Sequence, residues 1–188
     1  MIDARGRRPP VLTTARLLLR ELRTSDAPAV AVHAGDERVA RYLIEVPSPY
    51  PVALARRWIH GRSAWWELGR GVTFAVVRRD APDALLGTVS LRRHARDRRA
   101  ELGYWLAAAA WGRGLATEAV AAVIDFGFRQ LALARIHAQV FAGNDASMRV
   151  LEKLGMVHEG TKRRHLRKGD RLHDVELYGL LREEWSPP

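Results

Sequence analysis

A glycine-rich turn between a strand and a long helix constrains this fold more than any other feature. The run 110–118 reads AWGRGLATE and separates strand-like residues 100–106 from a segment whose apolar residues recur at helical spacing. Backbone amides in the first turn of a helix have no intrahelical acceptor, and the helix dipole adds about half a positive charge there. Gly112 and Gly114 allow positive φ and close approach of a ligand. The turn is therefore predicted to bind a phosphate group, although a plain strand-to-helix connection fits the same residues.

Composition restricts the class of protein. The 188 residues suffice for one domain with a substantial core. The chain has no cysteine, which excludes disulfides, thiolate zinc sites and cysteine nucleophiles and suits a reducing, cytoplasmic compartment. No apolar run is long enough to predict a membrane span. A formal net charge of +10 favours acidic partners such as nucleotide-like cofactors, RNA or a ribosome, although the many arginines are also typical of a GC-rich genome.

The order of the elements predicts an α+β domain. Residues 1–11 are basic and contain prolines, which predicts a flexible tail, and residues 12–186 are expected to form one domain. Periodicity and turn residues predict strands at 12–23, 72–78, 85–93, 99–106 and 136–141, helices at 27–34, 36–43, 52–68 and 114–131, a helix after Asn144, and a closing hairpin of 157–167 and 172–181. Short connections between successive strands favour a mostly antiparallel sheet.

Several motifs in this order resemble those of the GNAT superfamily of acyl-CoA-dependent N-acyltransferases. They are WGRGLA at 111–116, NDAS at 144–147 and LEKLGM at 151–156. The segment 160–178, with HDV at 173–175, resembles the Rim-type branch, which includes enzymes that acetylate ribosomal protein N-termini. The resemblance implies an α/β sandwich with about seven strands and four or five helices. Its sheet would splay into a V between the fourth and fifth strands and hold acetyl-CoA, as cosubstrate, in the cleft.

The resemblance also implies which residues hold the cofactor, and it implies no metal. Backbone near Trp105 and Leu106 would pair with the pantetheine arm and polarise the thioester carbonyl, while Asn144 would contact CoA. Trp111 stands where the superfamily motif has Arg or Gln, a difference common in the Rim-type branch. The pyrophosphate would be held by the backbone amides of Gly112, Arg113, Gly114, Leu115, Ala116 and Thr117.

Transfer to an amine needs a base, an oxyanion site and a proton for the leaving thiolate. The resemblance places Ser147 beside the sulfur as proton donor, with Tyr178 in reserve; a helix cap and a packed aromatic are the respective alternatives. Strand alternation puts Glu101 on the face of Gly103 and Trp105, where it could act as base or form a plain salt bridge. His165 is the other candidate base, and His165 and Tyr178 are the candidate substrate contacts.

The sequence leaves the acceptor amine open. At pH 7 an α-amine with pKa about 7.8 is roughly one-seventh neutral, whereas a lysine is neutral to about four parts in ten thousand. A protein N-terminal α-amine is therefore the preferred acceptor. A small-molecule acetyltransferase acting on aminoglycosides, polyamines or amino acids is one alternative, and a non-catalytic nucleic-acid-binding module is another. The basic run 162–168 predicts either a solvated hairpin or a patch that steers an acidic partner, in a monomer or a homodimer.

Overall fold

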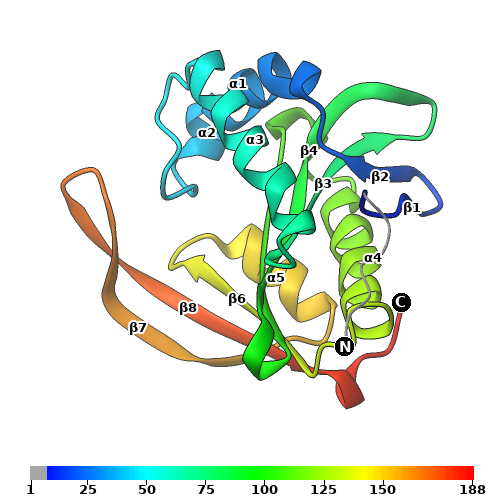
Figure 1. Ribbon diagram of the computed structural model, residues 1–188. Helices are drawn as coiled ribbons and strands as arrows, with labels where there is room; N and C mark the ends of the chain where they lie inside the picture. Colours follow the sequence, from blue (N-terminus) through cyan, green and yellow to red (C-terminus); the bar gives the residue numbers. More distant parts are fainter. Residues whose placement is uncertain (1–7) are drawn as a thin grey trace.

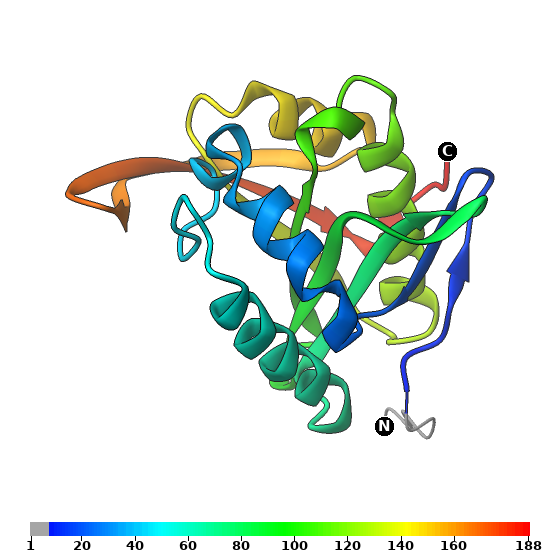
Figure 2. The same ribbon diagram turned by 90° about the horizontal axis from the view of Figure 1, so that it is seen from above.

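One mixed sheet runs through the protein and carries helices on both faces (Figures 1 and 2). A computed structural model describes residues 8–188, so that residues 1–7 of the predicted tail lie outside the described residues. The eight strands have the spatial order β1-β2-β3-β4-β5-β6-β8-β7. Their bounds are Leu12–Thr13 (β1), Leu17–Glu21 (β2), Gly71–Arg78 (β3), Ala81–His94 (β4), Arg99–Leu106 (β5), Arg135–Phe141 (β6), Val157–Lys168 (β7) and Arg171–Leu181 (β8).

The described residues form five α-helices, and together with the sheet these helices confirm the predicted α+β class. They are Ala27–Gly35 (α1), Glu37–Ala40 (α2), Val52–Glu67 (α3), Leu115–Arg129 (α4) and Asp145–Lys153 (α5). α4 and α5 pack on the face that carries Phe74 and Leu91, whereas α1 and α3 pack on the opposite face against Ala75 and Leu85. Two separate apolar cores result, one on each side of the sheet. Among the described residues, no helix has both the length and the apolar character needed to cross a membrane.

The strand expected at 12–23 is two strands, which is why the sheet has eight strands rather than about seven. Thr14 makes the break, because its N–H donates to the Leu17 carbonyl and its hydroxyl accepts from the Leu17 N–H, both at 3.0 Å. The chain reverses there, so that β1 pairs back on β2. Side-chain alternation does not reveal such a tight reversal.

A buried ion pair joins β2 to the start of α1. Arg20 and Asp26 are 5% and 4% exposed and share two hydrogen bonds of 2.8 and 2.9 Å. The Asp26 hydrogen bond raises the pKa of Arg20 against the opposing effect of burial. The same carboxylate accepts from the Arg23 N–H at 2.8 Å, so a buried charge fixes the chain just before α1. Asp26 is the N-cap residue of α1, but its side chain makes no capping hydrogen bond to that helix and serves this ion pair instead.

The sheet opens between β5 and β6, which are the one parallel pair among the described strands. β5 pairs with β6 from Arg99↔Arg135 to Leu102↔Ala138, and no pairing continues from Gly103 to Leu106. The remaining strand pairs are antiparallel. The predicted V between the fourth and fifth strands is therefore the opening between β5 and β6.

Candidate active site

A cavity of about 700 Å³ occupies the opening between β5 and β6. Its walls come from the end of β5, the turn before α4, the end of β6, the start of α5, the segment after α2 and the β7–β8 hairpin. Most of the site residues that the sequence predicted line this cavity. The predicted site residues that line it are Glu101, Trp105, Leu106, Gly112, Gly114, Leu115, Ala116, Thr117, Asn144, Ser147 and His165.

Two of the predicted residues, Tyr178 and Arg113, are not among those that line the cavity. The side chain of Tyr178 is buried in the core behind α5, where its hydroxyl donates to Glu152 Oε1 at 3.1 Å. Arg113 lies in the turn but is not among the residues that line the cavity, and its carbonyl faces Arg16. Strand alternation alone does not show that Tyr178 faces the core beneath a helix.

The turn before α4 exposes a row of unpaired backbone amides. Gly112 and Gly114 have backbone φ angles of 74° and 72°, which residues with a side chain rarely adopt. Within residues 8–188, none of the amides from Gly112 to Thr117 donates a hydrogen bond to the protein, and the first helical bond is from Glu118 to the Gly114 carbonyl. Consecutive free amides at a helix N-terminus form an anion-binding site. The turn thus has the geometry that a pyrophosphate requires.

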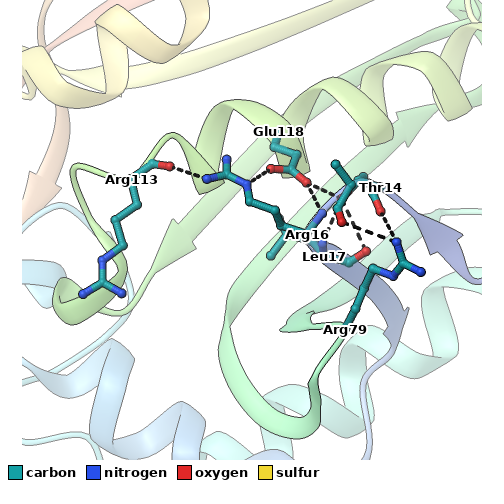
Figure 3. Close-up of polar contacts among 7 residues, drawn as sticks. Thr14, Arg16, Leu17, Arg79, Arg113 and Glu118 are labelled. Atoms are coloured by element: carbon teal, nitrogen blue, oxygen red, sulfur yellow. Dashed lines mark hydrogen bonds and ion pairs between the residues drawn. The ribbon is translucent and has the colours of Figure 1, made fainter.

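A carboxylate behind the turn fixes its position (Figure 3). Glu118 accepts from the Thr14 hydroxyl at 2.6 Å, the Arg16 N–H at 2.8 Å and the Arg16 Nε at 2.6 Å. Arg16 Nη1 in turn donates to the Arg113 carbonyl at 2.9 Å. Burial opposes ionisation of Glu118, but these hydrogen bonds outweigh it and lower its pKa. The β1–β2 turn is therefore tied to the anion-binding turn, a role that the sequence analysis did not assign to Glu118.

The end of β5 presents backbone groups to the opening. The Ala107 N–H donates to the Leu86 carbonyl at 2.7 Å, and Gly87 lies opposite Leu106. In this antiparallel register the amides of Tyr104 and Leu106 face β6, where no strand pairs with them. The Leu106 carbonyl on that edge accepts from Trp111 Nε1 at 2.9 Å. The Trp105 carbonyl lies on the β4 side, since a Cβ at Gly87 would collide with it. Leu106 and Tyr104, rather than Trp105, thus carry the free edge.

Ser147 and Tyr104 form a hydroxyl pair inside the cavity. Tyr104 Oη lies 2.8 Å from Ser147 Oγ and 3.1 Å from the Ser147 carbonyl. Burial raises the pKa of Tyr104 to about 12, with the Ser147 hydrogen bond acting in the opposite direction. The phenol is therefore protonated at neutral pH. The cap of α5 is Asn144, whose Oδ1 accepts from the Ser147 N–H at 3.3 Å, so the Ser147 hydroxyl is not a cap.

The opposite wall carries Glu101, which forms an ion pair with Arg92 on β4. The salt bridge that the sequence left as the alternative is thus present, and Glu101 also lines the cavity. His94 and His137 contribute ring nitrogens near the same carboxylate. Neither histidine was singled out in the sequence, because their proximity depends on the pairing of β4, β5 and β6.

Two contacts cross the mouth of the cavity. Lys168, at the end of β7, donates to the carbonyls of Leu43 and Val46 at 2.6 and 3.2 Å. Tyr42 donates to the Gly143 carbonyl at 3.5 Å, a weak contact. The β7–β8 hairpin and the segment after α2 are therefore in contact, and both line the cavity, with His165 on the hairpin.

Comparisons with known proteins agree with this geometry. Residues 16–157 match the family described as Acetyltransferase (GNAT) domain. YoaA, an uncharacterized N-acetyltransferase of Bacillus subtilis (strain 168), is 33% identical over 174 residues, which cover 92% of this chain and 97% of YoaA. The structure of RimJ of Mycobacterium smegmatis in complex with CoA-disulfide superimposes with a TM-score of 0.81 and is 27% identical in sequence. The match covers 94% of this chain and 87% of RimJ. A GNAT-family acetyltransferase from Bacillus anthracis has a TM-score of 0.82 and 26% identity, with coverage of 93% and 100%.

The fold and its cleft thus define an acyl-CoA-dependent N-acetyltransferase. The chain belongs to the GNAT acetyltransferase family, and its structural neighbours include Rim-type enzymes. This confirms the family that the sequence motifs indicated. Acetyl-CoA is the cosubstrate that this family and its CoA complexes support.

Proposed function

We propose that this enzyme acetylates the N-terminal α-amine of a protein. The observation that carries the proposal is the charge of the cavity wall. Its basic residues outnumber its two carboxylates, Glu101 and Asp145, and Glu101 is already paired with Arg92; the basic residues are Arg41, Arg92, Arg149 and Lys153. Aminoglycosides and polyamines carry several positive charges and would meet repulsion there. A peptide with one α-amine avoids this repulsion.

The cofactor would bind with its pyrophosphate on the amides from Gly112 to Thr117. These amides are free of protein acceptors within residues 8–188, as an anion site requires. Asn144 lines the same cavity and would contact CoA from the start of α5. The pantetheine arm would then run along the free edge of β5, where the Leu106 amide can donate to the thioester carbonyl and to the oxyanion that replaces it.

The chemistry would proceed by direct attack in a ternary complex. The amine nitrogen forms a bond to the thioester carbon, and the carbon–sulfur bond then breaks. The amine proton passes to Glu101, directly or through water, and the thiolate takes a proton from the Ser147 hydroxyl, which Tyr104 Oη can replenish across 2.8 Å. No cysteine is present to form an acyl-enzyme on sulfur. His165, at the edge of the cavity, is the second candidate base.

The low pKa of an α-amine suits this arrangement. Deprotonating it at pH 7 costs about 1 kcal/mol, against about 4.6 kcal/mol for a lysine side chain. Glu101 is held in an ion pair with Arg92, and such a base can more readily deprotonate the α-amine, which has the lower free-energy cost. Ribosomal proteins are candidate substrates because a relative that is 36% identical over 104 residues, YdaF of Bacillus subtilis (strain 168), is described as a putative ribosomal N-acetyltransferase.

The test follows thiol release from acetyl-CoA with a panel of acceptors. The panel holds peptides with a free N-terminus, the same peptides with a blocked N-terminus and an internal lysine, a polyamine and an aminoglycoside. We expect turnover with peptides whose N-terminus is free. Peptides with a blocked N-terminus should not be acetylated, even though they contain an internal lysine. A higher kcat/KM for the polyamine or the aminoglycoside would support the small-molecule alternative. Salt-sensitive RNA binding without thiol release would support the nucleic-acid-binding alternative.

A further inference from the structure

Three side chains from neighbouring strands converge at the cavity wall that carries Glu101. His94 ends β4, Glu101 lies in β5 and His137 lies in β6. Glu101 is directly opposite His137, while His94 is opposite Arg99, which shares the sheet face of Glu101. One potential ligand atom from each of the three residues lies within 4.8 Å of the others, and the two imidazole rings have centroids 5.9 Å apart.

His137 has an unused coordinating atom. Its Nδ1 is buried and has no hydrogen-bond partner among the described residues. Unpaired buried polar atoms are uncommon in folded proteins. Burial also lowers the pKa of His137, with the charge of the nearby Glu101 acting in the opposite direction. A neutral imidazole is the form that binds metal ions.

Glu101 can serve as the anionic ligand without losing its present partner. Its Oε2 is held by Arg92, whereas Oε1 accepts no hydrogen bond within residues 8–188. Arg99 and Arg135 flank His137 and lower its pKa further, and their charges would also oppose a cation. We therefore expect weaker binding than in a closed structural zinc site.

The donor set indicates which ion would bind. Two imidazoles and one carboxylate are the ligands of several catalytic zinc sites, which leave a fourth position open. Tetrahedral zinc with bonds of about 2.0–2.1 Å places its ligand atoms closer together than 4.8 Å, so the side chains would move inward by about 1 Å. All three residues are only half-buried, which leaves room for that movement. The lack of cysteine excludes thiolate sites only, so it does not argue against this one.

We propose that His94, Glu101 and His137 form a binding site for a divalent transition-metal ion, Zn²⁺ in particular. The resemblance to the family implied no metal, and nothing in the comparisons assigns one. Because Glu101 is the base in the proposed function, an ion bound there would inhibit acetyl transfer; this consequence rests on the proposed function, whereas binding itself does not.

The test is calorimetry with ZnCl₂ on the full chain, stripped with chelator and free of any histidine tag. We expect one equivalent to bind to the unmodified protein, with at least about tenfold weaker binding in His94→Ala and His137→Ala, as loss of one ligand implies. The matched control is His60→Ala, which removes an exposed histidine of α3 outside the cluster. Its affinity should be unchanged. Cobalt substitution should add visible absorption bands that both cluster variants lose.

Two results would overturn the proposal. One is the absence of stoichiometric Zn²⁺ binding, and the other is binding that persists unchanged in both cluster variants. Circular dichroism and acetyl-CoA binding verify that each variant is folded, so that lost metal binding is not lost structure. Glu101→Gln supplies a second variant that keeps the side-chain volume. Metal binding without inhibition would count against Glu101 as the base and leave the metal site intact.

Discussion

Replacing Glu118 with alanine should loosen the anion-binding turn from behind, without touching the ligand. The carboxylate accepts three hydrogen bonds, one from Thr14 and two from Arg16, and Arg16 also holds the Arg113 carbonyl (Figure 3). Its removal therefore separates the β1–β2 turn from the start of α4. We expect a loss of stability together with weaker acetyl-CoA binding.

The size of the effect follows from burial. Glu118 is 17% exposed and Arg16 is 47% exposed, so solvent screens their ion pair to below about 1 kcal/mol. The bonds from the Thr14 hydroxyl and the Arg16 N–H reach a charged acceptor, and we take the lower end of about 1.5–3 kcal/mol for each. The sum is about 3 kcal/mol, which lowers Tm by roughly 6–12 °C in a domain of this size.

The assays are urea denaturation and calorimetry with acetyl-CoA. Glu118→Ala should lose about 3 kcal/mol of stability and bind acetyl-CoA about tenfold more weakly, which corresponds to 1.4 kcal/mol. Glu118→Gln keeps the acceptor oxygen but not the charge and should lie in between. Glu67→Ala, at the exposed end of α3, is the control and should resemble the unmodified protein. A loss below about 1 kcal/mol in Glu118→Ala, with unaltered acetyl-CoA affinity, would refute the reasoning.

Three further predictions follow from the same contacts. Ser147→Ala should lower turnover about a hundredfold or more, and Tyr104→Phe by a smaller factor, with acetyl-CoA affinity kept in both; unchanged rates would remove the pair from the chemistry. Asp26→Ala leaves the buried Arg20 charge unpaired and should cost about 3–5 kcal/mol in urea denaturation, whereas an effect below about 1 kcal/mol would contradict the burial argument. The pKa of Tyr104 is raised to about 12 when folded, so stability should fall as pH rises from about 10 toward that value, and Tyr104→Phe should abolish this component of the pH profile.

The sequence predicted the turn and its ligand class because the evidence for them is local. Two glycines ahead of an amphipathic helix specify a backbone conformation directly, and the amides from Gly112 to Thr117 are indeed free of acceptors within the described part of the chain. Most element bounds agree within a few residues for the same reason. The tight reversal at Thr14 was missed because it depends on two hydrogen bonds with Leu17, one backbone to backbone and one to the Thr14 hydroxyl, which residue patterning does not reveal.

Contacts between elements that are far apart in the chain could not be predicted from the sequence. Tyr104 of β5 meets Ser147 of α5 across 43 positions, and Glu118 of α4 meets Arg16 of the β1–β2 turn across 102, so both contacts depend on how the helices pack on the sheet. His94 and His137 likewise converge through the register of three strands. For Tyr178 the pairing register had the reverse effect. The sequence predicted this residue of the closing hairpin at the active site, but the register of β8 places its side chain in the core behind α5.

Calorimetric titration of CoA-stripped protein with acetyl-CoA measures directly whether the cleft between β5 and β6 is the cofactor site. One equivalent should bind there, with an affinity in the range of roughly 1 μM to 1 mM. Gly114→Val strains the turn at φ 72° and should weaken that binding severely. No binding of acetyl-CoA at millimolar concentration, or binding that Gly114→Val leaves unchanged, would show that the turn before α4 does not hold the cofactor.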